Sequence, residues 1–427
     1  MKTIFKKSFG IIIIFLCAMI SPGTSQDDNW THYRGNNLDG ISTVDNVPVR
    51  WKADSNIVWK TGIHGRGWSS PVVFNDRIWL TTATDDGGEM FAVCLDFETG
   101  EVLMDINVFA PDSIYRKHAI NSYATPTPCI EKDFVYVHFG RYGTTCLNTK
   151  DGSTVWKRTD LECEHIQGPG SSPFLYKNLL ILHMEGSDVQ YIVALDKSNG
   201  KTVWRIERPK DVYDRLEPIG KKAYITPLIV KVDGRDQLIS NGAAVCIAYE
   251  PETGKEIWRV IRGVDSTIAM PFSEDGIVYF YTGFTVPDQG SKFANLMAVD
   301  PGGHGDVALT NIIWSIETPV LQLLTPVIKD GLIYTIDSKS KMMCIDAKTG
   351  QSIWTERVKG KYNSSPVYAS GHLYFSSTRG EVIVIKEGRR FEIAAINDLE
   401  NEIWATPAIL RNSLLIRTSK HLYKIGK

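Results

Sequence analysis

A proline recurs eight times along the chain at intervals of 40 to 57 residues, with a small residue before it in seven copies and Met270 in the eighth. This recurrence constrains the fold more than any other feature, because periods of this length are typical of solenoids and propellers. The eight copies are Ser70-Pro71, Thr127-Pro128, Ser172-Pro173, Thr226-Pro227, Met270-Pro271, Thr325-Pro326, Ser365-Pro366 and Thr406-Pro407.

Each repeat predicts four short antiparallel strands. A strand follows the proline, a turn such as Asn75-Asp76 leads to a second strand, and the third strand ends in a turn such as Asn199-Gly200. Such units cannot bury both faces alone, but they can stack radially around an axis. We therefore predict an all-β fold, an eight-bladed β-propeller of four-stranded antiparallel blades. Residues 57–59 would supply the outer strand that closes the ring, and four tryptophans would fill equivalent slots between blades: Trp156, Trp204, Trp258 and Trp354.

The N-terminus has the pattern of a secretory signal, with three lysines followed by an apolar run over residues 9–20. The run is shorter than the roughly 20 residues that span a bilayer. We expect residues 1–25 to be removed and residues 26–427 to form one propeller domain, a secreted or periplasmic monomer without membrane insertion. The formal net charge is −2 and becomes more negative without the leader lysines, which argues against nucleic acid as a partner.

The six cysteines after the leader form no C-x-x-C pair, no C-x-x-C-H haem site and no adjacent pair. Cys94, Cys146 and Cys344 occupy one repeat position, where other repeats have alanine. We expect them to be packed structural residues, and the sequence predicts no metal site.

The stretch from Ala194 through Asp196 and Gly200 to Trp204 resembles the repeat A-x-D-x-x-T-G-x-x-x-W of the pyrroloquinoline-quinone-like propeller family. The resemblance implies the propeller fold across nearly the whole mature chain. It leaves function open, since the family includes quinoprotein dehydrogenases, the propeller lipoprotein of outer-membrane barrel assembly and uncharacterised secreted proteins. The dehydrogenases need a quinone, calcium ligands and commonly an adjacent-cysteine ring. This sequence has neither that ring nor a compact Glu/Asn/Asp cluster, so no cofactor is expected and pyrroloquinoline quinone is disfavoured.

Polar loops gather in the first half of the chain, where they enter the proline strands or follow the second strands. Five histidines fall there, His64, His118, His138, His165 and His183. His138 and His183 each lie ten residues after the proline of their repeat, so they occupy equivalent positions in neighbouring blades. The same offset elsewhere gives Thr81, Tyr281, Ile336, Ser376 and Arg417.

Histidine, tyrosine and arginine without paired carboxylates suit proton abstraction beside a carboxylate. We therefore predict a lyase or oligosaccharide dehydratase that performs β-elimination at a uronic-acid residue of an acidic oligosaccharide or polysaccharide. The use of these residue types on one propeller face is similar to that in some secreted propeller polysaccharide lyases. The candidate catalytic residues, expected to meet in one pocket near the axis, are His118, His138, His165, His183, Tyr123 and Tyr213. The candidate substrate-binding residues are Arg116, Arg141, Arg208, Arg215 and Tyr224.

Two alternatives stay open. A non-catalytic periplasmic scaffold like the barrel-assembly propeller would bind partner proteins through exposed apolar residues in the same loops. A quinoprotein dehydrogenase is less favoured, for want of the cysteine pair and the carboxylate cluster.

Overall fold

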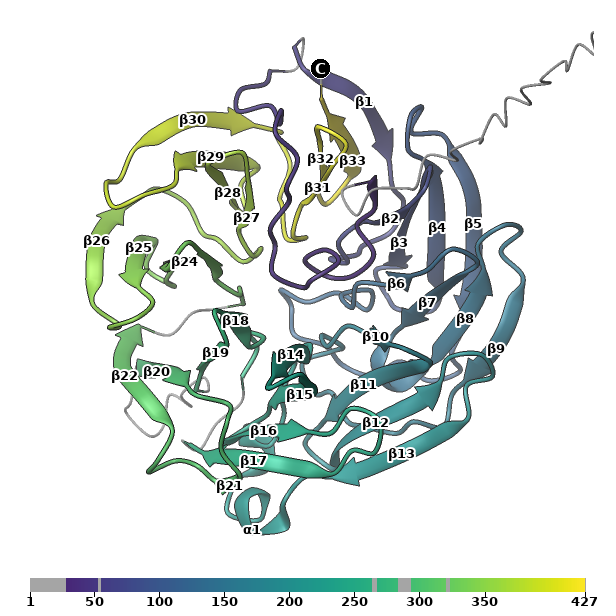
Figure 1. The fold of residues 1–427 in the computed structure, drawn as a ribbon. Helices are drawn as coiled ribbons and strands as arrows, with labels where there is room; N and C mark the ends of the chain where they lie inside the picture. Colours follow the sequence, from purple (N-terminus) through teal and green to yellow (C-terminus); the bar gives the residue numbers. More distant parts are fainter. Residues whose placement is uncertain (1–27, 53–54, 263–266, 283–292, 320–322, 427) are drawn as a thin grey trace, which may run out of the picture.

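The structure is a computed structural model that describes residues 28–426, apart from 53–54, 263–266, 283–292 and 320–322. The expected leader at 1–25 lies outside the described residues. Eight β-sheets stand around a central axis as blades, each with four antiparallel strands at its centre (Figure 1). The predicted eight-bladed propeller is confirmed.

In the first four blades the strands follow one another in chain order from the axis to the rim. They are β2 (Val72–Phe74), β3 (Arg77–Ala83), β4 (Met90–Asp96) and β5 (Val102–Phe109); β6 (Cys129–Ile130), β7 (Phe134–His138), β8 (Thr144–Asn148) and β9 (Thr154–Arg158); β10 (Phe174–Tyr176), β11 (Leu179–Glu185), β12 (Gln190–Asp196) and β13 (Thr202–Glu207); and β14 (Leu228–Val232), β15 (Arg235–Asn241), β16 (Val245–Tyr249) and β17 (Glu256–Ile261).

The remaining blades follow the same plan. They contain β18 (Phe272–Glu274), β19 (Ile277–Tyr281), β20 (Phe293–Val299) and β22 (Ile312–Pro319); β23 (Val327–Lys329), β24 (Leu332–Ile336), β25 (Lys341–Asp346) and β26 (Ser352–Arg357); β27 (Val367–Ala369), β28 (His372–Ser376), β29 (Glu381–Lys386) and β30 (Ile393–Asp398); and β31 (Ala408–Leu410), β32 (Ser413–Arg417) and β33 (His421–Ile425). Short helical turns lie in the loops: η2 (Gly140–Tyr142), α1 (Lys210–Tyr213) and η3 (Pro218–Gly220).

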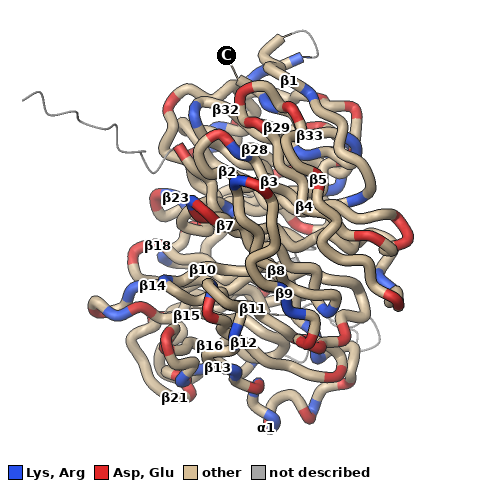
Figure 2. Tube along the Cα trace, turned by 90° about the vertical axis from the view of Figure 1, so that its right-hand side faces the viewer, with Lys and Arg blue, Asp and Glu red and all other residues tan. Residues whose placement is uncertain are grey.

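Two additions complete the sheets. The strand β1 (Ile57–Gly62) pairs antiparallel with β33, so the two ends of the propeller share the eighth blade, as the sequence predicted. The two-residue strand β21 (Gly305–Asp306) adds in parallel to β17 at the rim of the fourth blade. Basic and acidic residues are interspersed over the side of the ring seen in Figure 2.

The residue before each repeat proline joins neighbouring blades close to the axis. The backbone N–H of Ser70 donates to the Thr127 hydroxyl at 2.9 Å, and the N–H of Thr127 donates to Ser172 at 3.0 Å. The same bond continues from Ser172 to Thr226, from Met270 to Thr325, from Thr325 to Ser365 and from Ser365 to Thr406. A hydroxyl residue therefore recurs at this position because it links one inner strand to the next.

The tryptophans link the blades at the rim. The indole N–H of Trp156 donates to the Lys197 carbonyl in the next blade at 2.8 Å. Trp204 and Trp354 make the equivalent bonds to Pro251 and Gly388, so their predicted slots are confirmed. Trp59 and Trp314 do the same.

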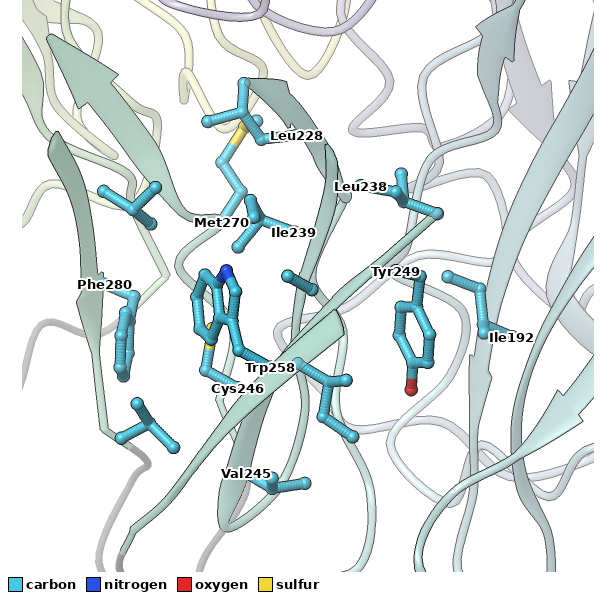
Figure 3. Packing of buried hydrophobic residues seen from close by; sticks show 14 of the residues in the cluster. Ile192, Leu228, Leu238, Ile239, Val245, Cys246, Tyr249, Trp258, Met270 and Phe280 are labelled. Atoms are coloured by element: carbon cyan, nitrogen blue, oxygen red, sulfur yellow. The ribbon is translucent and has the colours of Figure 1, made fainter. Parts of the chain in front are cut away.

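Trp258 reaches its slot in a different way. The indole is fully buried between the fourth and fifth blades, near Phe280 and Met270 (Figure 3). Its N–H donates to Oε1 of Gln237 at 2.8 Å, and the Gln237 amide donates to the Pro301 carbonyl of the next blade at 3.2 Å. Gln237 therefore connects the Trp258 indole to the next blade, whereas the other tryptophans donate directly to a carbonyl of that blade.

The segment after the leader, residues 29–42, fills the centre of the ring (Figure 1). Trp30 pairs with Val73 of the first blade, and Ser42 donates to the Tyr368 carbonyl of the seventh. Between them, the buried guanidinium of Arg34 donates to the carbonyls of Thr325 at 3.0 Å and Pro326 at 2.7 Å. The axis is therefore occupied by the chain itself, which the repeats do not predict.

Candidate functional site

The position ten residues after the proline is buried and faces the next blade. His183 Nδ1 lies 3.0 Å from the Ser240 hydroxyl of the fourth blade, and Arg417 donates to the Ser69 hydroxyl of the first blade at 2.7 Å. Thr81 similarly donates to the Pro126 carbonyl at 3.3 Å. In the fourth blade Asn241 takes this position. Counting ten residues from the proline does not reach Asn241, because the first hairpin of the fourth blade is longer. Leu228 pairs with Ile239 there, whereas in the third blade Phe174 pairs with Ile181.

Three of the four candidate histidines are closed to solvent. His138, His165 and His183 are 2%, 6% and 1% exposed. Burial, with His165 nearby, lowers the pKa of His138 to about 3, and burial also lowers the pKa of His165 to about 4. Burial, Arg208 and His165 hold the pKa of His183 well below its ordinary value. His165 therefore lies near both His138 and His183, and all three imidazoles are neutral at pH 7. The sequence placed His138 and His183 in one pocket near the axis. In the structure both are closed to solvent, because His183 lies against Ser240 of the next blade and His138 Nδ1 lies 2.8 Å from the Thr144 hydroxyl of its own blade.

Arg208 and Tyr213 belong to a buried network around Glu185. Arg208 Nε donates to Glu185 Oε1 at 2.5 Å, and the Tyr213 hydroxyl donates to Oε2 at 2.7 Å. The other guanidinium nitrogens of Arg208 donate to Tyr249 at 2.8 Å and to the Ser240 hydroxyl at 2.7 Å. Burial alone would lower the pKa of Arg208, but Tyr249 and Glu185 outweigh it and raise that pKa. These two candidates therefore join the third and fourth blades instead of facing a ligand.

The close packing of this network explains a glycine. A Cβ added to Gly242 would lie 2.3 Å from Glu185 Oε1 and 2.5 Å from the Tyr213 hydroxyl. The network residues Glu185, Ser240 and Tyr249 were absent from the candidates. Glu185 comes two residues after His183 on β11, the one local signal that was available.

The other candidates lie at the surface or around one cavity. His118 and Arg215 are exposed, and the buried ring of Tyr224 lies beside His165. Four candidates line a small recess of about 10 Å³: Arg116, Tyr123, Arg141 and His165.

A larger cavity of about 370 Å³ adjoins this recess and shares Tyr115, Arg141 and Tyr142 with it. It lies where the loop after β5 meets the second blade. Two tyrosines fix this loop: the Tyr115 N–H donates to the Tyr142 hydroxyl at 2.9 Å, and the Tyr123 hydroxyl donates to the Tyr115 carbonyl at 3.0 Å. The guanidinium of Arg141, on η2, stacks 3.4 Å from the centre of the Tyr115 ring.

The cysteines are packed residues, as predicted. Cys94, Cys146 and Cys344 are buried and form no disulfide. Burial raises the pKa of Cys94 to about 12, which makes its thiol a poor nucleophile.

The residues around the axis do not fit a quinone with its calcium ion. Calcium requires several carboxylate or carbonyl oxygens. The equivalent positions at the end of the second strand of each blade, called the ring positions, include Thr81, His138, His183, Asn241 and Tyr281. Within the described ranges, histidines, cysteines and carboxylates do not gather in threes as a metal site. No helix of the described chain is long and apolar enough to cross a bilayer.

The fold and these sites define the class, an eight-bladed propeller built from pyrroloquinoline-quinone-like repeats. The chain belongs to the family described as outer membrane protein assembly factor BamB, whose model matches residues 46–211, 188–302 and 248–390.

Individual relatives are distant. Tetrathionate hydrolase of Acidithiobacillus ferrooxidans is 21% identical over 332 residues, which span 60% of this chain and 63% of that protein, less than two thirds of its length. The crystal structure of BamB from Moraxella catarrhalis matches with a TM-score of 0.60 at 13% identity, covering 87% of this chain and 97% of that one. The quinohemoprotein alcohol dehydrogenase of Comamonas testosteroni matches with a TM-score of 0.69 at 11% identity, covering 94% and 81%. At these identities the structural likeness concerns the fold.

Proposed function

We propose that the protein is a non-catalytic scaffold of the cell envelope that docks a partner protein on the loop after β5. The observation that carries this proposal is the exposure of this loop's apolar side chains. Ile114, Tyr115 and Ile120 are 42%, 43% and 43% exposed. Exposed apolar residues on a fixed loop are the anchors that a docking surface requires.

The burial of the candidate catalytic groups supports the same function. His183, Arg208 and Tyr213 link the third and fourth blades, and His138 is buried against Thr144 of its own blade, so these side chains do not reach a dissolved substrate. The family description adds outer membrane protein assembly as the process, which would place this protein in the periplasm. We infer that its partner is a component of that assembly apparatus.

The test is recovery of the partner from an envelope extract. We expect the wild-type protein to retain one defined partner, and Ile114→Ser with Ile120→Ser to lose it. Ile396→Ser is the matched control, since Ile396 is 57% exposed on β30 at the rim and far along the chain from this loop. Equal recovery by all three proteins would contradict docking through the loop.

Elimination at a uronic acid is a second candidate, favoured by the recess that Tyr123, Arg141 and His165 share. In this reaction a base takes the C5 proton, the electron pair forms the C4=C5 double bond, and the C4–O bond breaks as its oxygen is protonated. The neutral imidazole of His165 would accept the C5 proton, the Tyr123 hydroxyl would protonate the leaving oxygen, and Arg141 would neutralise the carboxylate. Ultraviolet absorbance of the conjugated product, measured across a panel of sulfated and unsulfated uronans, tests it. A flat signal across the panel contradicts the lyase and leaves the scaffold unaffected.

A further inference from the structure

The cavity between the first two blades has the size and lining of a small-molecule site. Its volume of about 370 Å³ falls at the lower end of the roughly 300–1,000 Å³ typical of ligand pockets. Its lining includes the apolar and aromatic side chains of Phe109, Pro111, Tyr115 and Tyr142. It also includes polar residues, which are Asp112, Ser113, Arg141, Lys157, Thr159 and Glu162.

Arg141 is the group in this cavity that most clearly lacks a partner of opposite charge. Among the residues that the structure describes, its guanidinium forms no hydrogen bond and no ion pair, while its plane stacks on Tyr115. Because Tyr142 and Tyr123 hold the Tyr115 backbone, the guanidinium is oriented before any ligand arrives. A planar guanidinium fixed in this way matches a carboxylate through two parallel N–H···O bonds. Lys157 is already engaged, since its ammonium donates to the Val108 carbonyl at 2.6 Å.

His165 supplies an independent sign of a ligand. Its side chain lines the recess together with Arg141, and its Nδ1 atom is buried without a hydrogen-bond partner among the described residues. Buried ring nitrogens in proteins are normally satisfied. The recess has room for about one water molecule or one hydroxyl group.

We propose that this cavity binds a uronic-acid residue, with its carboxylate on Arg141 and a hydroxyl group in the recess against His165. A sugar acid carries several hydroxyl groups, which would pair with the lining residues Asp112, Ser113, Thr159 and Glu162. A protein side chain with one carboxylate would leave most of these polar groups without a partner. This inference goes beyond the scaffold function: the cavity shares Tyr115 with the docking loop, but its test changes Arg141, whereas the docking test changes Ile114 and Ile120.

The test is calorimetric titration of the full-length protein with two sugars that differ in one group. Methyl glucuronide carries a carboxylate where methyl glucoside has a hydroxymethyl group. We expect the glucuronide to bind, more weakly at higher salt, and the glucoside to bind at least about tenfold more weakly. Arg141→Gln should lower the affinity for the glucuronide by about tenfold or more.

Arg205→Gln is the matched control. Arg205 also stacks on a tyrosine, 3.6 Å from the Tyr191 ring, but it is paired with Glu207 on the outer strand β13. Its substitution should leave glucuronide binding unchanged. Equal affinity for the two sugars, full binding by Arg141→Gln, or no binding by the wild type would each overturn the proposal. Tighter binding of N-acetyl-aspartate methylamide than of the glucuronide would also overturn it and would assign the cavity to an acidic residue of a partner protein.

Discussion

Gly200 of the third blade lies against the indole of Trp156 in the second: a Cβ added to Gly200 would come within 2.7 Å of the Trp156 ring. The same contact joins Gly100 to Trp59, Gly254 to Trp204 and Gly350 to Trp314. The glycine and the tryptophan of the repeat are thus two halves of one contact between neighbouring blades. This explains why both residues recur together along the sequence.

The contact predicts a stability difference between two glycines. Gly200 has φ +72° and Gly234 has φ +78°, so alanine is strained at both by about 1–2 kcal/mol. The added methyl group at Gly234 meets nothing within 4 Å, whereas at Gly200 it meets the indole. Gly200→Ala should therefore cost about 1–3 kcal/mol more than Gly234→Ala. Denaturant unfolding of both variants measures this, and equal losses would mean that the indole moves aside freely.

Trp258 contacts the next blade through Gln237, and its substitution tests how much this packing stabilises the fold. The side chain is fully buried, so Trp258→Ala should lower the free energy of unfolding by about 3–5 kcal/mol. Trp258→Phe keeps most of the packing but removes the bond to Gln237, and should cost less. Thermal unfolding followed by circular dichroism compares the two, and a larger loss for phenylalanine would contradict the packing argument.

Features of this molecule were predictable from the sequence where they depend on contacts within one repeat or on contacts that recur with the repeat. The blades were predictable because each repeat carries its own strands, turns and tryptophan, and each contact between blades recurs with the period. Seven of the eight ring positions followed from a fixed offset. Asn241 did not, since an insertion into one hairpin changes the count without changing the fold.

The site was less predictable, because its geometry depends on contacts between different repeats. The equivalence of His138 and His183 was visible in the sequence, but their burial was not. Burial depends on which side of the strand faces the next blade. Arg34 lies 291 residues from Thr325 in the sequence, and its segment is not part of the repeat, so the repeat does not predict that it lies on the axis. Arg141 was selected as an anion-binding residue, while its support from Tyr115 and Tyr142 became apparent only in three dimensions.

The buried histidines predict a loss of stability in acid. The ordinary histidine pKa is 6.5, and the folded protein lowers that of His138 to about 3 and that of His165 to about 4. Between these values the unfolded chain binds more protons, so stability is complete above about pH 6.5 and falls as the pH decreases toward 4. Each such histidine contributes up to about 1.4 kcal/mol per pH unit.

The measurement is the unfolding free energy from pH 8 to pH 4, compared between variants. His138→Gln should reduce the slope because it removes one buried titrating group. His118→Gln, at an exposed histidine, is the control for the substitution itself. One slope shared by the two variants and the wild type would contradict the role of buried His138 in acid sensitivity.

Arg34 gives the last prediction, which concerns the segment on the axis. Its guanidinium is fully buried and donates to the carbonyls of Thr325, Pro326 and Pro366, which begin the inner strands of the sixth and seventh blades. Arg34→Met fills similar space but leaves these carbonyls without their donor, so the free energy of unfolding should fall by about 2–5 kcal/mol. Arg50→Met is the control, because the exposed Arg50 makes its bond to Ala394 at the rim. Limited proteolysis should cut residues 29–42 faster in Arg34→Met than in Arg50→Met. Equal cleavage would show that the segment stays on the axis without the arginine.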